Sequence, residues 1–291
     1  MMRRGKLLRS LAAALLNLVL VVLIGGFLSA ALVRYSPGFD VDENDWNPQI
    51  GAATRAALHA ERESENHLPS FYLHYLRAAL HGDFGKSDHY KQPVSELLAG
   101  RASATLELVF TGTLSGLLFG GLLAWLAVWP RRTSLAVVAA GVSGLLLAIP
   151  PAVLALEFFQ RDSWVELALA LAVLPRVFGT MRAILTEFAA SSSLLAARAR
   201  GLGAFALAIR YVFRPALPRL ATLAGVALVL AFGLAIPIES LCDVNGVGNL
   251  AWHAATARDL PLLCGLALII TSIVAVVQSL ASLAGETKTN P

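Results

Sequence analysis

The chain has few charged residues. Only 14% of its 291 residues are Asp, Glu, Lys or Arg, whereas an average soluble domain carries about 25%. At the same time 57% of the residues are apolar, and the mean hydropathy is +0.67. A water-soluble fold could not bury that much apolar surface, so the composition excludes disorder and argues against a soluble enzyme. It indicates an integral membrane protein.

Residues that build disulfide frameworks and metal sites are also scarce. There are two cysteines, Cys242 and Cys264, and six histidines. Both cysteines are interpreted as apolar residues, although an oxidising compartment would permit a bridge. Five histidines share one segment at spacings of 8, 7, 7 and 8 residues, unlike the i, i+4 pairs of a helical zinc site: His59, His67, His74, His81 and His89. No metal ion or other cofactor is expected.

Catalytic motifs are missing as well. The fragment Gly85-Lys86-Ser87 resembles the end of a phosphate-binding loop, but the glycine required five residues earlier is replaced by Leu80. A turn is the better interpretation of this fragment. No serine-hydrolase or zinc-protease pattern occurs, so we expect no enzyme activity in this chain.

Six apolar runs are long enough for a membrane-spanning helix, which needs roughly 20 residues: Leu11–Val33, Ala104–Val128, Thr133–Phe159, Trp164–Ile184, Leu220–Ile238 and Pro261–Leu283. The fourth is the weakest, because Pro175 and Arg176 interrupt it. The first is longer than the apolar region of a signal peptide, which favours an uncleaved anchor. We therefore predict an all-α integral membrane protein with six transmembrane helices.

Charge in the loops predicts the orientation. With the N-terminus inside, the basic residues gather on the inner side: Arg3, Arg4, Lys6, Arg9, Arg131, Arg132, Arg182, Arg198, Arg200, Arg210, Arg214, Arg219 and Lys288. Most acidic residues fall outside. The expected organisation is residues 1–33 as N-terminus and first span, 34–103 as an extracytoplasmic segment, 104–284 as a five-helix core with a cytoplasmic loop at 187–219, and 285–291 as a cytoplasmic tail. The basic surplus is thus a topology signal and not a nucleic-acid site.

Few ionisable residues lie inside the spans. Glu107, Glu157 and Glu166 are near span ends, where a carboxylate can reach water. A proton-coupled carrier is expected to have an acidic side chain near the bilayer centre. Because none is evident, energy for any transport is expected to come from another subunit.

The segment Ser191–Pro218 carries the functional argument. Its first half is helix-prone and Gly201 is suited to end that helix, while Leu202, Phe205, Ile209 and Val212 recur at helical spacing. Pro215 and Pro218 are expected to stop the second helix before the fifth span. Two short helices with an apolar stripe suit docking into another protein; an interfacial helix lying on lipid is the alternative.

Three stretches together resemble a known family. Ala196-Ala197-x-x-x-Gly201 followed by Leu217-Pro218 resembles the EAA loop of ABC-importer permeases. Gly82–Leu108 and Ile238–Gly265 resemble segments of the first (B-type) permease of the oligopeptide/dipeptide/nickel branch. The similarity runs from about Tyr72 to the sixth span. Leu195 stands where the loop's glutamate would be, and Ser191–Ser193 replace acidic and aromatic residues, which leaves the activity of the loop open.

The resemblance implies a subunit of the inner (plasma) membrane with both termini cytoplasmic. It would work with a second permease, two cytoplasmic ATPase subunits and an extracytoplasmic binding protein, and would carry peptides or a similar small solute such as a nickel chelate. The ATPase-coupling residues would be Ala196, Ala197, Arg198, Arg200, Gly201, Leu202, Phe205, Ile209, Leu217 and Pro218. The outer loop near the path would use Glu239, Gly246, Gly248, Arg258, Asp259 and Pro261.

Helix breaks at Pro150-Pro151 and at Pro237 are further candidates to border the path. Two other classes stay open at this point. One is a non-transport scaffold or sensor that docks a cytoplasmic partner through loop 187–219, and the other is an ion-coupled secondary carrier.

Overall fold

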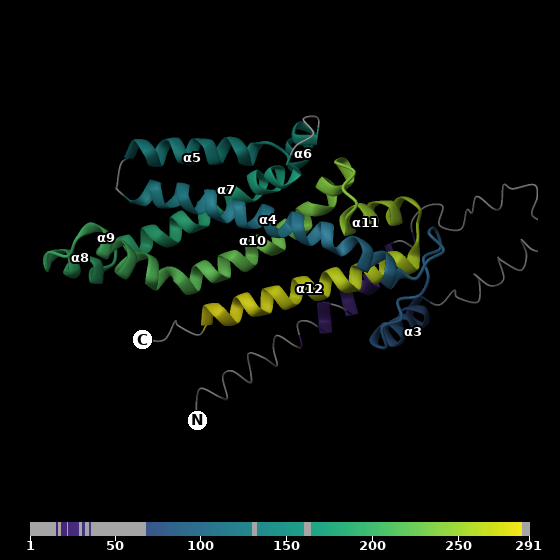
Figure 1. The fold of residues 1–291 in the computed structure, drawn as a ribbon. Coiled ribbons are helices and arrows are strands. Elements are labelled where there is room, and N and C mark those ends of the chain that lie inside the picture. The colour runs from purple at the N-terminus through teal and green to yellow at the C-terminus, as the bar shows by residue number, and fades with distance from the viewer. Residues whose placement is uncertain are drawn as a thin grey trace, which may run out of the picture. The chain divides into compact units, whose positions relative to one another are not determined.

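A computed structural model describes residues 68–129, 133–159 and 164–286, with scattered positions between 16 and 35. The described chain is built of helices (Figure 1): α3 (Leu68–Leu80), α4 (Val94–Val128), α5 (Thr133–Ala148), α6 (Pro151–Phe159), α7 (Val165–Ala189), α8 (Ser192–Ala199), α9 (Ala204–Leu207), the π-helix η2 (Ala208–Phe213), α10 (Arg214–Leu241), α11 (Val247–Thr256) and α12 (Leu260–Glu286). The expected all-helical class is confirmed.

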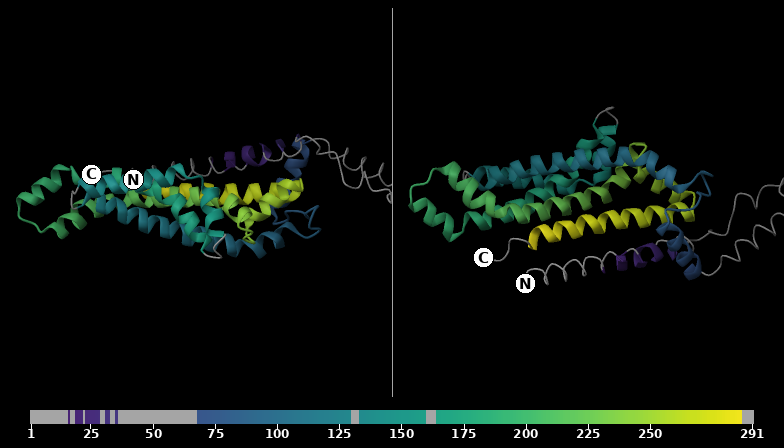
Figure 2. Two further views of the ribbon diagram at one scale, coloured as in Figure 1. Left: turned by 90° about the horizontal axis from the view of Figure 1, so that it is seen from above. Right: turned by 60° about the horizontal axis from the view of Figure 1, so that its bottom comes forward.

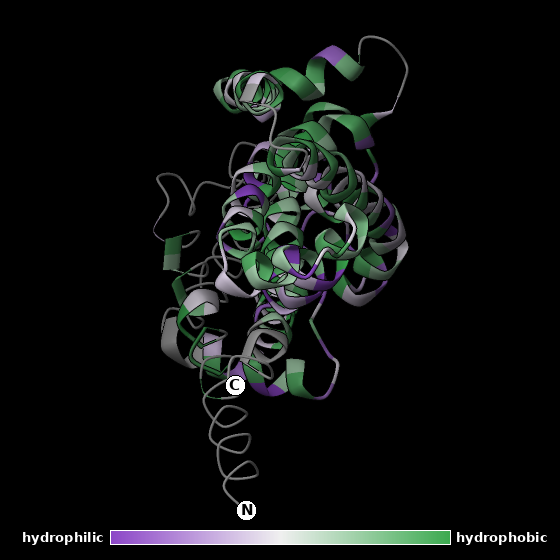
Figure 3. Cartoon of the chain, turned by 90° about the vertical axis from the view of Figure 1, so that its left-hand side faces the viewer, coloured by the Kyte–Doolittle hydropathy of each residue, from purple (hydrophilic) through white to green (hydrophobic). Residues whose placement is uncertain are grey.

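Four of these helices are long and apolar enough to cross a membrane. They cover Val94–Val128, Val165–Ala189, Ala204–Leu241 and Leu260–Ala281, and a bent pair adds a fifth candidate. They correspond to the second to sixth predicted spans. The predicted first span, Leu11–Val33, lies largely outside the described residues. Figure 3 shows that hydrophobic residues make up most of the length of the helices, as expected of helices surrounded by lipid.

The third predicted span is not one straight helix. The run Thr133–Phe159 divides into α5 and α6, which are bent by 87° at the break. Pro150 and Pro151 explain the break, because neither has an N–H and each disfavours helical geometry in the residue before it. The expected interruption at this pair is therefore confirmed.

The other proline predictions were wrong. Helix α9, η2 and α10 form one continuous helical run, Ala204–Leu241, although it contains Pro215, Pro218 and Pro237. Pro215 cannot donate the backbone hydrogen bond of an ordinary α-helix, and the π-helical turn directly before it accommodates the altered bonding pattern. Pro237 lies in the last turns of α10, and the helix continues past it to Leu241 although a proline removes one backbone hydrogen bond there.

The second span also differs from its predicted limits. Helix α4 begins at Val94, ten residues before the apolar run, and its 35 residues give a length of about 52 Å. Glu96 and Arg101 are good helix formers, so the helix continues beyond the apolar part.

The chain divides into two compact units, each described here by itself. Unit 1 comprises Met1–Ala102 and Leu250–Ala275, and unit 2 comprises Ser103–Asn249 and Val276–Pro291. In unit 2, α4 and α7 approach closely along three glycines spaced four residues apart, Gly112, Gly116 and Gly120. A methyl group added at Gly120 would lie 3.0 Å from the Leu174 carbonyl oxygen. Small residues at this spacing let two membrane helices pack backbone to backbone.

Unit 1 is organised around α3 and the start of α12. Tyr75 on α3 is buried, and its hydroxyl lies 3.2 Å from the Phe84 carbonyl oxygen and 3.1 Å from that of Pro261. Burial raises the pKa of Tyr75 far above the ordinary phenol value, so the hydroxyl stays a neutral donor. This contact connects the chain before α4 to the beginning of α12.

Candidate functional site

The segment predicted to couple to an ATPase forms a hairpin of two short helices, the α8–α9 hairpin (residues 192–207). Ser191 caps α8, its side chain accepting a hydrogen bond from the Leu194 N–H at 3.4 Å. Helix α8 ends at Ala199, and Gly201 follows with φ +76°, a left-handed conformation that favours glycine. The prediction that Gly201 ends the first helix is confirmed. In Figures 1 and 2 the hairpin lies at one end of α7 and α10.

The hairpin has two different sides. Leu194, Ala197 and Leu207 are buried and belong to the hydrophobic core that α4, α5 and α7 supply. The opposite side is exposed and carries apolar and basic side chains together, Leu195, Ala196, Arg198, Arg200, Leu202 and Phe205, and Ile209 at the start of η2 is exposed as well. Phe205 is 80% exposed. The inner side holds the hairpin in place, and the outer side is an apolar surface with basic edges.

The predicted stripe of four apolar residues is split between these two sides. Leu202, Phe205 and Ile209 face outward, whereas Val212 is completely buried. The turn of π-helix explains the difference, because it rotates later residues relative to an ordinary α-helical face. The ring of the neighbouring Phe213 packs edge-on against Trp125 of α4, with 6.3 Å between ring centroids. Leu217 is exposed and Pro218 half-buried, one turn further along α10.

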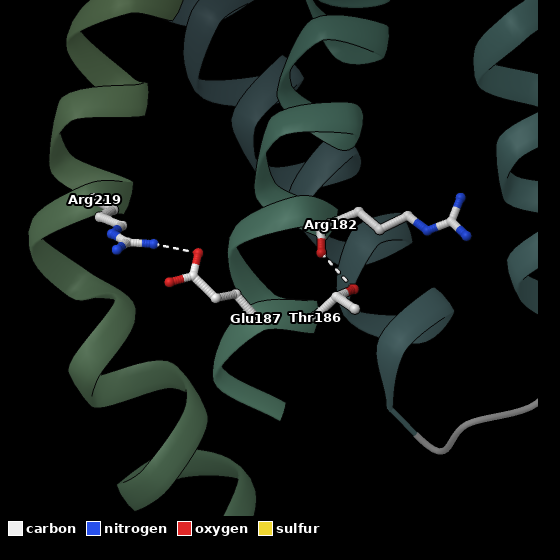
Figure 4. Close-up of polar contacts among 4 residues, drawn as sticks. All are labelled: Arg182, Thr186, Glu187 and Arg219. Carbon is white, nitrogen blue, oxygen red and sulfur yellow. Dashed lines mark hydrogen bonds and ion pairs between the residues drawn. The ribbon is translucent and has the colours of Figure 1, made fainter. Parts of the chain in front are cut away.

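An ion pair closes the base of the hairpin. The Arg219 Nη1 atom of α10 lies 2.5 Å from the Glu187 Oε2 atom of α7, and the guanidinium also lies 5.4 Å above the Phe188 ring centroid. Figure 4 shows Arg219 and Glu187 directed toward each other, while Arg182 extends from the other side of α7. This contact ties together the two helices that enter and leave loop 187–219.

A buried glutamate organises the opposite end of α10. Glu239 is fully buried, and its Oε2 atom accepts hydrogen bonds from the N–H groups of Gly248 at 2.7 Å and Asn249 at 3.2 Å. The Thr105 hydroxyl lies beside this carboxylate and accepts from the Val247 N–H at 2.7 Å. These residues, with Gly246, are called the Glu239 cluster. A carboxylate at the first N–H groups of a helix satisfies donors that the helix itself leaves unpaired.

The two glycines of this cluster make room for the carboxylate. A methyl group at Gly246 would meet the Glu239 carboxylate and the Thr105 hydroxyl, and one at Gly248 would lie 2.7 Å from the Ile236 Cα atom. Glu239, Gly246 and Gly248, all predicted from the outer-loop motif, are thus brought together by the fold.

The remaining outer-loop residues belong to unit 1. Buried Asp259 accepts a hydrogen bond from the Ser87 hydroxyl and from the His89 N–H at 3.1 Å, and its Oδ1 atom accepts from the Leu262 N–H at 3.1 Å. It therefore joins the start of α12 to the Gly85-Lys86-Ser87 turn. Arg258 is exposed with φ 56°, and Pro261 is half-buried. The two motifs found separately in the sequence meet at Asp259 and Ser87.

Both cysteines are buried free thiols. The Cys242 Sγ atom lies 3.4 Å from the Ala155 carbonyl oxygen. No group of three metal-binding side chains occurs within residues 68–129, 133–159 and 164–286.

A groove runs between α7 and α10 inside unit 2. Its volume is about 310 Å³, and apolar side chains of both helices line most of it. Four polar residues also line it, Arg176 and Thr180 from α7 and Arg219 and Thr222 from α10. In the sequence Arg176 is only an interruption of the fourth predicted span, and a lone arginine in the middle of an apolar run is the one signal that points to the groove.

The described fold consists of apolar helices long enough to cross a membrane, with the α8–α9 hairpin at one end of α7 and α10. Residues 104–285 match the model of the family described as binding-protein-dependent transport system inner membrane component, and the chain belongs to this family. It is therefore a multi-pass inner membrane permease subunit of an ABC importer, not an enzyme. The family membership decides for transport over a scaffold or sensor.

Similar proteins from other bacteria support the assignment. The chain is 26% identical to the glutathione transport system permease protein GsiC of Salmonella typhimurium (strain LT2), covering 86% of this chain and 87% of that protein. Identity to the GsiC protein of Escherichia coli (strain K12) is 25% over the same shares. A putative peptide permease protein of Brucella suis biovar 1 (strain 1330) is 29% identical, covering 87% of this chain and 89% of that protein.

Proposed function

We propose that this chain is the first permease of an ABC importer for peptides or peptide-like solutes such as glutathione. The proposed substrate class rests on the similarity to a glutathione permease and to a putative peptide permease. The chain would pair with a second permease, receive substrate from an extracytoplasmic binding protein and be driven by two ATPase subunits.

The proposed topology has six spans. Residues 1–33 would form the cytoplasmic N-terminus and first span, 34–103 an extracytoplasmic segment, 104–284 the permease core and 285–291 a cytoplasmic tail. The excess of Arg in loop 187–219 supports a cytoplasmic position for the hairpin. The Glu239 cluster would then lie near the outer face.

One observation carries this proposal: the outer side of the hairpin continues directly into a candidate span. The helical run Ala204–Leu241 has 38 residues, a length of about 57 Å. It begins beside exposed Phe205 and reaches Glu239 near its other end. A displacement imposed on the hairpin by an ATPase can therefore reach the far side of the membrane along one helix.

The hairpin turn offers a test with a matched control. Gly201 has φ +76°, while Gly203 has φ −64°, and a methyl group at either would meet nothing within 4 Å. Gly201→Ala should cost about 1 kcal/mol in the hairpin from its left-handed backbone. Gly201→Val adds a β-branched side chain at the same position and should abolish substrate-stimulated ATP hydrolysis of the complete transporter without preventing membrane insertion.

Gly203→Ala and Gly203→Val are the controls, since the backbone there is already extended. They should keep most of the stimulated hydrolysis. Normal stimulation in Gly201→Val, or equal losses at both positions, would count against the coupling role of the hairpin.

A further inference from the structure

Arg176 lies at the middle of a candidate membrane span. Eleven residues of α7 precede it and thirteen follow, which places it about 17 Å and about 20 Å from the two helix ends. Its side chain is exposed and lines the groove between α7 and α10. A charged side chain at this depth is retained where it faces protein or a water-filled cavity, not lipid.

The groove carries one uncompensated positive charge. Arg219, its other cation, is paired with Glu187 at 2.5 Å. No carboxylate among the residues that the structure describes forms an ion pair with Arg176. Thr180 lies one turn after Arg176 and lines the same groove, as does Thr222 of α10, whose hydroxyl donates to the carbonyl oxygens of Pro218 and Ala281. The guanidinium of Arg176 is therefore a charge in an otherwise largely apolar wall.

We propose that Arg176 binds a carboxylate of the substrate as it passes the membrane centre. This deepens the proposed function and rests on it: every linear peptide with a free C-terminus carries a carboxylate, and a guanidinium can bind one through two parallel hydrogen bonds. An anionic lipid headgroup lies at the membrane surface, too far from the middle of α7 to reach Arg176. A transported anion is the ligand that reaches this depth.

The groove can be probed directly through Thr180→Cys in the complete transporter, reconstituted in phosphatidylcholine vesicles. A negatively charged and a positively charged methanethiosulfonate reagent are compared for their rates of reaction with the introduced thiol. The natural cysteines are buried, and the parent protein gives their background. The negative reagent should react about tenfold faster, because a positive charge raises the local concentration of anions.

Three further substitutions, each made in the Thr180→Cys protein, identify the residue that supplies the positive charge. Arg176→Gln should remove the preference for the negative reagent, and Arg176→Lys should keep it. Arg182→Gln is the matched control, since Arg182 belongs to the same helix but extends from its other side, above the Phe178 ring; it should leave the preference unchanged.

Protection by ligand tests the carboxylate itself. Trialanine should slow the labelling, trialanine amide should not, and Arg176→Gln should abolish the protection. An unreactive thiol, equal rates for the two reagents, equal protection by acid and amide, or loss of the second permease from the purified Arg176→Gln complex would each overturn the proposal.

Uptake separates this inference from the proposed function. ATP-dependent uptake of trialanine is measured in the same vesicles with the binding protein present. Absence of uptake by the parent transporter would contradict the peptide substrate class. Uptake without a charge-dependent labelling pattern would overturn the role of Arg176 alone.

Discussion

Arg219 and Glu187 form an ion pair with 2.5 Å between Nη1 and Oε2, although they are 32 positions apart in the chain. They hold the end of α7 against the start of α10. Their side chains are 45% and 62% exposed, so water screens the attraction and its contribution to stability is about 0–1 kcal/mol. The contact is therefore more important for the position of the hairpin than for the stability of the fold.

A double-mutant cycle tests this positioning role. Glu187→Gln, Arg219→Gln and the double variant are compared for substrate-stimulated ATP hydrolysis by the complete transporter. Each single variant should lower the stimulation by up to about fivefold, the equivalent of about 1 kcal/mol, and the double variant should be no worse than either. The thermal midpoint should stay unchanged. Independent, additive losses would show that the two residues do not act through their contact.

The Glu239 cluster makes a prediction about stability. Glu239→Ala would leave the Gly248 and Asn249 N–H groups without their buried acceptor and should destabilise the protein by about 2–5 kcal/mol. Glu239→Gln keeps an oxygen acceptor and should cost less. Unfolding in detergent, followed by tryptophan fluorescence, measures both.

Glu107→Gln is the control for the Glu239 variants, because Glu107 is an exposed glutamate on α4. It should leave the unfolding midpoint within about 0.5 kcal/mol of the parent. A Glu239→Ala protein as stable as this control would contradict the assigned bonding.

Gly248 should tolerate no side chain. Gly248→Ala would place a methyl group 2.7 Å from the Ile236 Cα atom, and this backbone neighbour cannot turn away, so we expect a loss of about 1–3 kcal/mol. Gly233→Ala on α10 is the matched comparison, because a methyl group there meets nothing within 4 Å. That variant should be neutral or stabilising by up to about 1 kcal/mol. Equal unfolding midpoints for the two variants would argue against the close approach.

Long apolar runs were the most reliable guide to the fold. Ala104–Val128 and Pro261–Leu283 each lie within a single helix, although α4 begins ten residues earlier than predicted, and Gly201 ends α8 as its position indicated. Proline was a poor guide to helix ends: Pro150 and Pro151 interrupt a helix, but Pro215 and Pro218 do not. The outcome depends on the π-helical turn before Pro215, which local propensity does not reveal.

Site residues that are close together in the sequence could be predicted from it. Site residues that only the packing of distant helices brings together could not. Glu239, Gly246 and Gly248 lie within ten residues and were found from one motif. Thr105, which completes their cluster, lies 142 positions away from Val247. The pairing of Asp259 with Ser87 likewise spans 172 positions, and no periodicity connects such residues.

The docking role of the hairpin is tested most directly by a photocrosslinking amino acid at position 205 in the complete transporter. Phe205 is the most exposed large apolar side chain of the hairpin, and the same probe at Leu241, at the other end of the helical run Ala204–Leu241, serves as control. Crosslinking of position 205, and not of position 241, to an ATPase subunit is the predicted result. Crosslinking of position 205 to lipid or to the extracytoplasmic binding protein would contradict the account.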